Sequence, residues 1–289
     1  MVLMITSSLY LPAYFKERGD FYTSVEYAQM YLDDGRYSEL IIEYNYVLGF
    51  PPSEVARESL ISIIYDVCEK DDVRDTIGDV FAPRPGRVRY DREDIESLLE
   101  EHFVHERQDP VMVLNVLYLD GVWNEKSNVL GLSFGGENIV MFKHTIRTVT
   151  EKSSNLEIND VETSVLIHEF GHLISLVGIG HGSRHEDEEY EHHCDESAGR
   201  CVMSSSVEIK VDDYSEPPPT EFCPLCLEEI EHIREAESGW GIGEYLTLIL
   251  VAGQASIGAV WIAVCFSKDD DDEYDIYHQY YDDFEKDGH

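Results

Sequence analysis

The stretch Asp160–Val177, DVETSVLIHEFGHLISLV, constrains the chain more than any other, because it combines helically spaced apolar residues with two histidines. The spacing predicts a helix, and on a helix residues four apart lie on one face. His168 and His172 can therefore hold one metal ion together. Glu169 lies about 100° round the helix from His168, within reach of a water molecule at that metal. This is the H-E-x-x-H zinc pattern, in which the glutamate is the general base; the alternative is two partly buried histidines on a core helix.

A third ligand must come from elsewhere, because a catalytic zinc site usually has three protein ligands and a water. Four histidines downstream of the helix are candidates: His181, His185, His192 and His193. His193 directly precedes a cysteine, and His181 follows Gly178 at a distance that lets the chain turn back towards a metal. Each of the four can supply the neutral imidazole required, so the residues alone leave the choice open.

Four cysteines follow the same helix: Cys194, Cys201, Cys223 and Cys226. The N-terminus has no obvious secretory signal peptide, so we expect a reducing environment, in which clustered cysteines bind metal more often than they form disulfides. The final Cys223-x-x-Cys226 pair predicts a four-thiolate structural zinc site. Free thiols and a pair of disulfides are the less favoured alternatives.

The chain is strongly acidic, with 21 basic residues, 59 acidic residues and a formal net charge of -38. This charge argues against nucleic acid and anionic membrane surfaces as partners. It suits a protein that works at high salt, where screening reduces self-repulsion, and it equally suits one that collects divalent cations.

The first half of the chain has the patterns of an α/β or α+β unit. We expect strands at Leu40–Leu48 and Val111–Leu119, the second buried on both faces, helices at Glu54–Glu69 and Arg92–His102, and a loop at Asp71–Arg89. Leu130–Phe142 has the pattern of two short strands joined at Gly135-Gly136. This hairpin is either an ordinary one or a strand pair that lies along a cleft and binds an extended peptide.

The region Tyr245–Phe266 has no charged residue across 22 positions, and about 20 apolar residues are enough to cross a bilayer. It predicts a transmembrane helix, with a buried core helix as the alternative. The chain then divides into a zinc-binding domain at 1–237, a membrane span at 245–266 and an acidic tail at 267–289. We expect a single-pass membrane protein whose zinc-binding domain lies in the cytoplasm.

The histidine and cysteine motifs resemble those of the archaemetzincins, a branch of the metzincin zinc peptidases. The matching pieces are His168-Glu169-Phe170-Gly171-His172, His193-Cys194, Cys201-Val202-Met203 and Cys223-Pro224-Leu225-Cys226. The resemblance implies an α+β, metzincin-like domain with a mixed sheet and an active-site helix. It implies two zinc ions: a catalytic one on His168, His172 and His193 with Glu169 as general base, and a structural one on Cys194, Cys201, Cys223 and Cys226. Met203 is expected in the turn beneath the catalytic metal. The implied activity is that of a metalloendopeptidase or aminopeptidase acting on peptides or proteins.

The sequence departs from the family pattern in two places. Ser175 stands where the family has a turn glycine three residues after the second histidine, so we expect the helix to continue to Leu176 or Val177. An acidic insertion, about Gly178–His192, then separates the helix from the His-Cys pair. Two other functions fit the same motifs: a membrane-anchored zinc-binding adaptor without catalysis, and a zinc hydrolase acting on a non-peptide amide.

Overall fold

A five-stranded mixed sheet lies at the centre of the structure, in the order β2-β1-β4-β7-β6. The strands are β1 Glu39–Val47, β2 Asp72–Phe81, β4 Val111–Leu119, β6 Gly131–Phe134 and β7 Asn138–Phe142. The pairs β1–β2, β1–β4 and β4–β7 are parallel, whereas β6 runs antiparallel to β7 at one edge. Two short strands, β3 Arg89–Tyr90 and β5 Val122–Trp123, form a separate parallel pair.

The structure is a computed structural model that describes residues 24–33, 35–84, 89–153, 155–177, 183–205, 207 and 217–235. The predicted membrane span at 245–266, the acidic tail at 267–289 and the candidate ligand His181 lie outside these residues. Among the helices of the described ranges, none is both long enough and apolar enough to cross a membrane.

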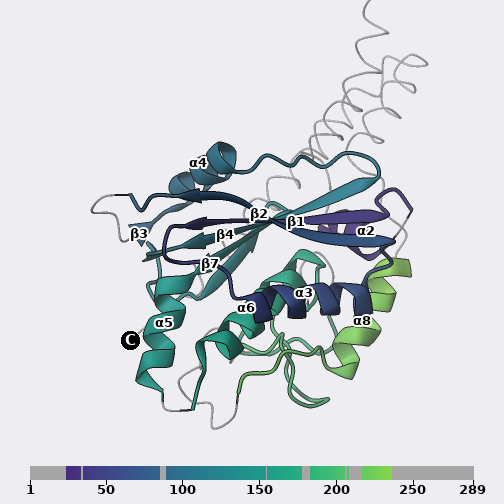
Figure 1. The fold of residues 1–289 in the computed structure, drawn as a ribbon. Coiled ribbons are helices and arrows are strands. Elements are labelled where there is room, and N and C mark those ends of the chain that lie inside the picture. The colour runs from purple at the N-terminus through teal and green to yellow at the C-terminus, as the bar shows by residue number, and fades with distance from the viewer. Residues whose placement is uncertain are drawn as a thin grey trace, which may run out of the picture. The chain divides into compact units, whose positions relative to one another are not determined.

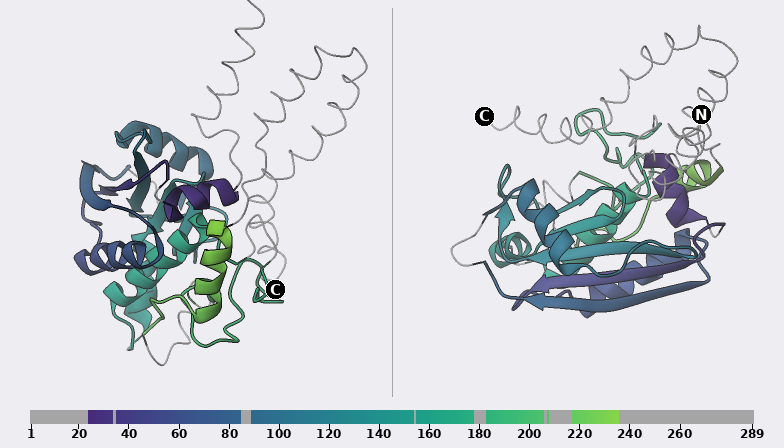
Figure 2. Two further views of the ribbon diagram at one scale, coloured as in Figure 1. Left: turned by 90° about the vertical axis from the view of Figure 1, so that its right-hand side faces the viewer. Right: turned by 90° about the horizontal axis from the view of Figure 1, so that it is seen from above.

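Helices cover both faces of the sheet (Figure 1). On one face lie α3 Glu54–Val67, α5 Lys143–Lys152 and α6 Ile158–Leu173, and on the other lies α4 Arg92–His102. Two further helices, α2 Ser24–Leu32 and α8 Pro224–Glu235, lie side by side (Figure 2). The Gln29 side chain of α2 donates a hydrogen bond of 3.0 Å to the carbonyl of Ile233 in α8. This contact joins the beginning of the described chain to its end.

Strand β4 is buried on both faces, as its composition predicts. Leu114, Val116 and Tyr118 belong to the main apolar cluster with α3 and α6. Val113 and Leu117 alternate with them and are also buried, outside that cluster and on the opposite face of the strand. A strand of this kind needs a helix layer on each side, and the fold supplies both.

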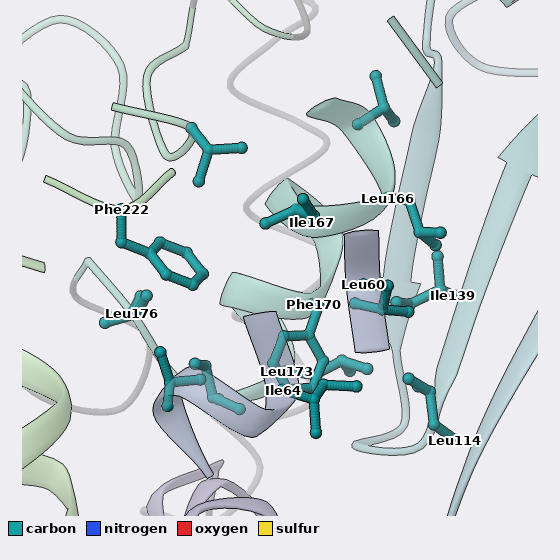
Figure 3. Packing of buried hydrophobic residues seen from close by; sticks show 14 of the residues in the cluster. Leu60, Ile64, Leu114, Ile139, Leu166, Ile167, Phe170, Leu173, Leu176 and Phe222 are labelled. Carbon is teal, nitrogen blue, oxygen red and sulfur yellow. The ribbon is translucent and has the colours of Figure 1, made fainter. Parts of the chain in front are cut away.

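Helix α6 is buried on every side from Val161 to Leu173, its polar residues as well as its apolar ones, because other elements enclose it. In Figure 3, Phe170 and Leu173 of α6 lie beside Leu60 and Ile64 of α3, while Ile167 points towards Phe222. The Phe170 ring also meets the ring of Tyr31 edge-on, with 5.8 Å between centroids. Contacts with the sheet, with α3 and with Phe222 therefore fix the helix that carries both motif histidines.

A buried ion pair secures the first half of α6. Glu162 is fully buried, and its carboxylate pairs with Lys143 at the start of α5. The other carboxylate oxygen accepts the backbone N–H of Ser53, the residue that caps α3, at 2.7 Å. Burial lowers the pKa of Lys143, while Glu162 acts in the opposite direction. One carboxylate thus links three helices on the same side of the sheet.

The structure confirms several predicted elements and overturns the predicted loop. The helix at Arg92–His102, the strand at Val111–Leu119 and the strand pair in Leu130–Phe142 are confirmed. The predicted loop Asp71–Arg89 is wrong over most of its length, because Asp72–Phe81 forms β2. An edge strand needs only one partner, so its exposed residues can be polar and its apolar pattern is weak. The expected mixed sheet with a helix that carries the motif histidines is present, in a mixed α/β arrangement whose sheet is mostly parallel.

Candidate metal centre

Three imidazoles converge at the C-terminal end of α6. His168 and His172 occupy successive turns of the helix, and His193 arrives from the following loop. The ring centroids are 4.6 Å apart for His168 and His172, 5.3 Å for His168 and His193, and 5.6 Å for His172 and His193. Each residue offers one nitrogen, and these nitrogens all lie within 4.8 Å of one another.

The spacing of these nitrogens fits a zinc ion. The Nε2 atoms of His168 and His172 are 3.0 Å apart. Two nitrogens on a tetrahedral zinc, at about 2.0 Å from the ion, lie about 3.3 Å from each other. All three imidazoles are buried, so little water competes with their nitrogens for a metal ion.

Backbone carbonyls orient two of the three imidazoles. His168 Nδ1 donates to the carbonyl oxygen of Val202 at 2.7 Å, and His193 Nδ1 donates to that of Glu191 at 2.7 Å. With the proton on Nδ1, the Nε2 lone pair is left for a metal. Nothing in the sequence pattern points to these two acceptors, because both are backbone carbonyls, one two residues from His193 and the other 34 residues from His168.

Glu169 follows His168 directly on α6, and its buried side chain lies against edge strand β6. A Cβ atom on Gly131 of β6 would lie 2.9 Å from Glu169 Cγ, 3.0 Å from Glu169 Oε1 and 2.8 Å from Val165 Cγ1. These distances are shorter than ordinary carbon contacts, so only glycine fits at residue 131 without moving the carboxylate. Sequence reasoning missed Gly131, since a glycine at the start of a strand gives no catalytic signal.

Four thiols form a second buried cluster: Cys194, Cys201, Cys223 and Cys226. The Sγ atoms are 3.7 Å apart for Cys194 and Cys223, and 3.5 Å for Cys201 and Cys226. A disulfide requires about 2.05 Å, whereas two thiolates on a tetrahedral zinc lie about 3.8 Å apart. These cysteines are free thiols in the structure, and their spacing is that of a tetrahedral ligand set.

Hydrogen bonding within this cluster separates the proton affinities of its thiols. Contact with Cys194 is the largest cause that lowers the pKa of Cys223 and of Cys201. The same neighbour raises the pKa of Cys226. A bound divalent metal would favour the thiolate state in all four cysteines.

The imidazole and thiol clusters share two stretches of chain. His193 belongs to the first and Cys194, the next residue, to the second. Cys201 is in the thiol cluster, and the following residue Val202 accepts the His168 hydrogen bond. Met203 comes next and lies against Gly171 of α6, where a Cβ would overlap its sulfur. Short stretches of backbone therefore connect the two clusters directly.

The other candidate third ligands lie elsewhere. His185 is buried at the thiol cluster, with its Nε2 3.3 Å from Cys226 Sγ. His192 lies beside Glu186, with 3.5 Å between Nδ1 and Oε1. Burial is the main cause that lowers its pKa. Among the described candidates, His193 alone joins His168 and His172.

Helix α6 ends earlier than the sequence predicts, at Leu173 rather than Leu176 or Val177. The Ser175 N–H donates to the carbonyl of His172 at 2.9 Å, and the Leu176 N–H to that of Gly171 at 3.0 Å. Ser175 itself has a φ of 60°, so it terminates the helix in the left-handed conformation that usually belongs to glycine. Ile174 and Leu176 are fully buried, and burying both side chains offsets the cost of that conformation.

Comparisons with known proteins give structural matches only. No protein-family model matches the chain, and no curated protein does. In structure, the chain is similar to the archaemetzincin of Methanopyrus kandleri, with 16% identity, a TM-score of 0.42 and coverage of 70% of this chain and 98% of that one. It is also similar to the archaemetzincin of Archaeoglobus fulgidus, with 14% identity, a TM-score of 0.38 and coverage of 66% and 99%. The structural matches thus come from the same family whose histidine and cysteine motifs this sequence resembles.

Proposed function

We propose that the chain is a zinc-dependent peptidase, with His168, His172 and His193 as ligands of a catalytic zinc and Glu169 as general base. The observation that carries this proposal is the convergence of three buried imidazoles, two of them on the helix that also carries the buried Glu169. A zinc ion bound there would polarise both a water molecule and the carbonyl of the scissile peptide.

In this proposal, backbone carbonyls orient the imidazole ligands and Glu169 transfers the proton. Val202 and Glu191 hold two imidazoles with their Nδ1 protons directed away from the cluster. The Glu169 carboxylate takes a proton from the attacking water and returns it to the leaving amine as the peptide C–N bond breaks. A non-catalytic adaptor has no use for a carboxylate at this position.

The substrate we propose is a peptide in extended conformation. Strand β6 forms one edge of the sheet as the structure describes it, and its Gly131 lies against Glu169. A peptide that added a further strand to β6 would run past this carboxylate. Both endopeptidase and aminopeptidase activity are compatible with that placement.

Glu169→Ala tests the base directly. The zinc-loaded variant should retain its metal and lose nearly all turnover of a mixed peptide library, measured by mass spectrometry of the products. Glu151→Ala, a change on the exposed surface of α5, is the matched control and should cleave as the wild type does. Cleavage by Glu169→Ala at the wild-type rate would rule out this base. Chelator-insensitive cleavage by the wild type would rule out the metal.

We also propose a second, structural zinc on Cys194, Cys201, Cys223 and Cys226. Support comes from the burial of the four thiols and from their tetrahedral spacing. Ligation at such a closed site contributes to the free energy of folding. In this chain it would also fix the direction of His193, the neighbour of Cys194.

Membrane anchoring by Tyr245–Phe266, with the zinc-binding domain in the cytoplasm, is a proposal from sequence alone. The expected result is that the full chain stays with membranes after alkaline extraction. Ile257→Arg, at the middle of this stretch, should move it to the soluble fraction. Ser238→Arg, outside the stretch, should not. Wild-type protein in the soluble fraction would contradict the anchor.

A further inference from the structure

His185 lies between the thiol cluster and a buried carboxylate. Its Nε2 is 3.3 Å from Cys226 Sγ and 3.5 Å from Glu229 Oε2. The imidazole, the thiol and the carboxylate are all buried. Neither the peptidase mechanism nor the zinc ligand sets account for a histidine at this place.

Ser183 lies beside the other nitrogen of His185 and can accommodate a proton on Nε2. The Ser183 hydroxyl oxygen accepts the backbone N–H of His185 at 3.4 Å and lies 3.2 Å from its Nδ1. The hydroxyl proton can then be donated to Nδ1, which leaves the imidazole proton on Nε2. In that form His185 donates towards Cys226 and Glu229.

Glu229 lies so close to Cys226 that a hydrogen-bond donor between the two side chains is favourable. Cys226 and Glu229 are three residues apart in α8, so their side chains share one face of the helix. A divalent ion on four thiolates leaves the cluster with two excess negative charges, and a nearby buried carboxylate is unfavourable beside them. An N–H group between thiolate and carboxylate lowers the energy of both.

Glu229 also reaches the end of the helix that carries the imidazoles. Its Oε2 accepts the backbone N–H of Val177 at 3.1 Å, and Val177 has a φ of 59°. The carboxylate therefore supports the strained turn by which the chain leaves α6. A contact that holds Glu229 in place affects both α8 and the exit of α6.

We infer that His185 is a positioning residue of the thiolate zinc site, which donates from Nε2 to Cys226 Sγ and separates that thiolate from Glu229. The inference rests on the second metal site of the proposed function, and it does not depend on peptide hydrolysis. It gives a role to a histidine that lies within the acidic insertion between the α6 helix and the His-Cys pair.

The first test measures zinc release from the zinc-loaded full chain into a chromogenic chelator. His185→Ala should release the thiolate-held ion about 10-fold faster than the wild type, a typical effect of losing a hydrogen bond to a metal ligand. His185→Gln keeps an N–H donor and should restore much of the difference. His232→Ala removes an exposed histidine from α8 and should behave as the wild type does.

The second test is spectroscopic and separates hydrogen bonding from mere packing. With cobalt in place of zinc, the sulfur-to-metal absorption should move to longer wavelength in His185→Ala, because the thiolate loses a donor. It should return towards the wild-type position in His185→Gln. Wild-type release kinetics together with an unshifted absorption in His185→Ala would overturn the inference, and so would a wild-type spectrum without a thiolate band. Neither readout involves peptide cleavage, so a failure here is distinguishable from a failure of Glu169 as the base.

Discussion

His168 Nδ1 donates a 2.7 Å hydrogen bond to the carbonyl oxygen of Val202, and Val202 follows a member of the thiol cluster, Cys201, directly in the chain. The orientation of a motif histidine therefore depends on backbone that the four thiols hold. His193 and Cys194 repeat this relationship from the other side. The two clusters use different ligand atoms, but the same stretches of backbone position both.

Removing two thiols should lower the zinc content from two ions per chain to one. In a Cys223→Ser, Cys226→Ser double variant, the remaining ion should also be lost to chelators more easily, because Val202 no longer holds His168 firmly. Elemental analysis of the purified chain measures both effects. Cys68→Ser is the control: burial raises the pKa of this core thiol to about 12, and it lies outside the cluster. One ion in both the wild type and the double variant would remove the structural site.

Ser175→Gly should stabilise the protein. Ser175 has a φ of 60°, which costs a residue with a side chain roughly 1 kcal/mol and costs glycine little. We expect the free energy of unfolding in urea to rise by about 0.5–1 kcal/mol. Ser175→Ala keeps the unfavourable backbone and removes only the buried hydroxyl. An equal gain in the alanine variant would show that backbone strain is not the cause.

Gly131→Ala should impair turnover without removing zinc. The new methyl group would crowd the Glu169 carboxylate and Val165, and a displacement of about 1 Å at a reacting group can lower a rate on the order of 100-fold. Steady-state kinetics should show the loss in kcat, with zinc content as in the wild type. Ser133→Ala, two residues along β6 on the same face, is the control. Unchanged kcat in Gly131→Ala would mean that Glu169 is not held in place by β6.

Glu43 should make stability fall at acid pH. Burial alone would raise the pKa of this carboxylate, but hydrogen bonds from Asn45, His105 and Val104 outweigh it and lower the pKa below its usual value. A depressed pKa contributes stability above the unfolded-state value, about 4.3, and that contribution is lost as pH falls through the folded-state pKa. At neutral pH, Glu43→Gln should cost about 1–3 kcal/mol.

The pH dependence of that difference is the measurement. Urea unfolding of wild type and Glu43→Gln should differ by a constant amount above about pH 5 and converge below it. Glu58→Gln, an exposed position on α3, should follow the wild type at every pH. A difference that does not shrink in acid would show that the charge of Glu43 is irrelevant to stability.

Local spacing in the sequence is enough to predict the features that repeat over a few residues. His168 and His172 share a helix face because the helical period places them there, and Val111–Leu119 is a central strand because its residues are apolar on both faces. The C-x-x-C pair likewise brings Cys223 and Cys226 to the start of one helix. Each of these follows from local spacing.

The remaining features depend on tertiary packing. His185 and His193 have the same chemistry in sequence, yet packing places one at the thiols and the other with the motif histidines. The edge strand β2 forms because β1 offers it a partner, and α6 stops before Ser175 because the buried side chains that follow require the chain to turn. Such outcomes depend on contacts between residues far apart in the chain, and the free energy of those contacts does not appear in any local pattern.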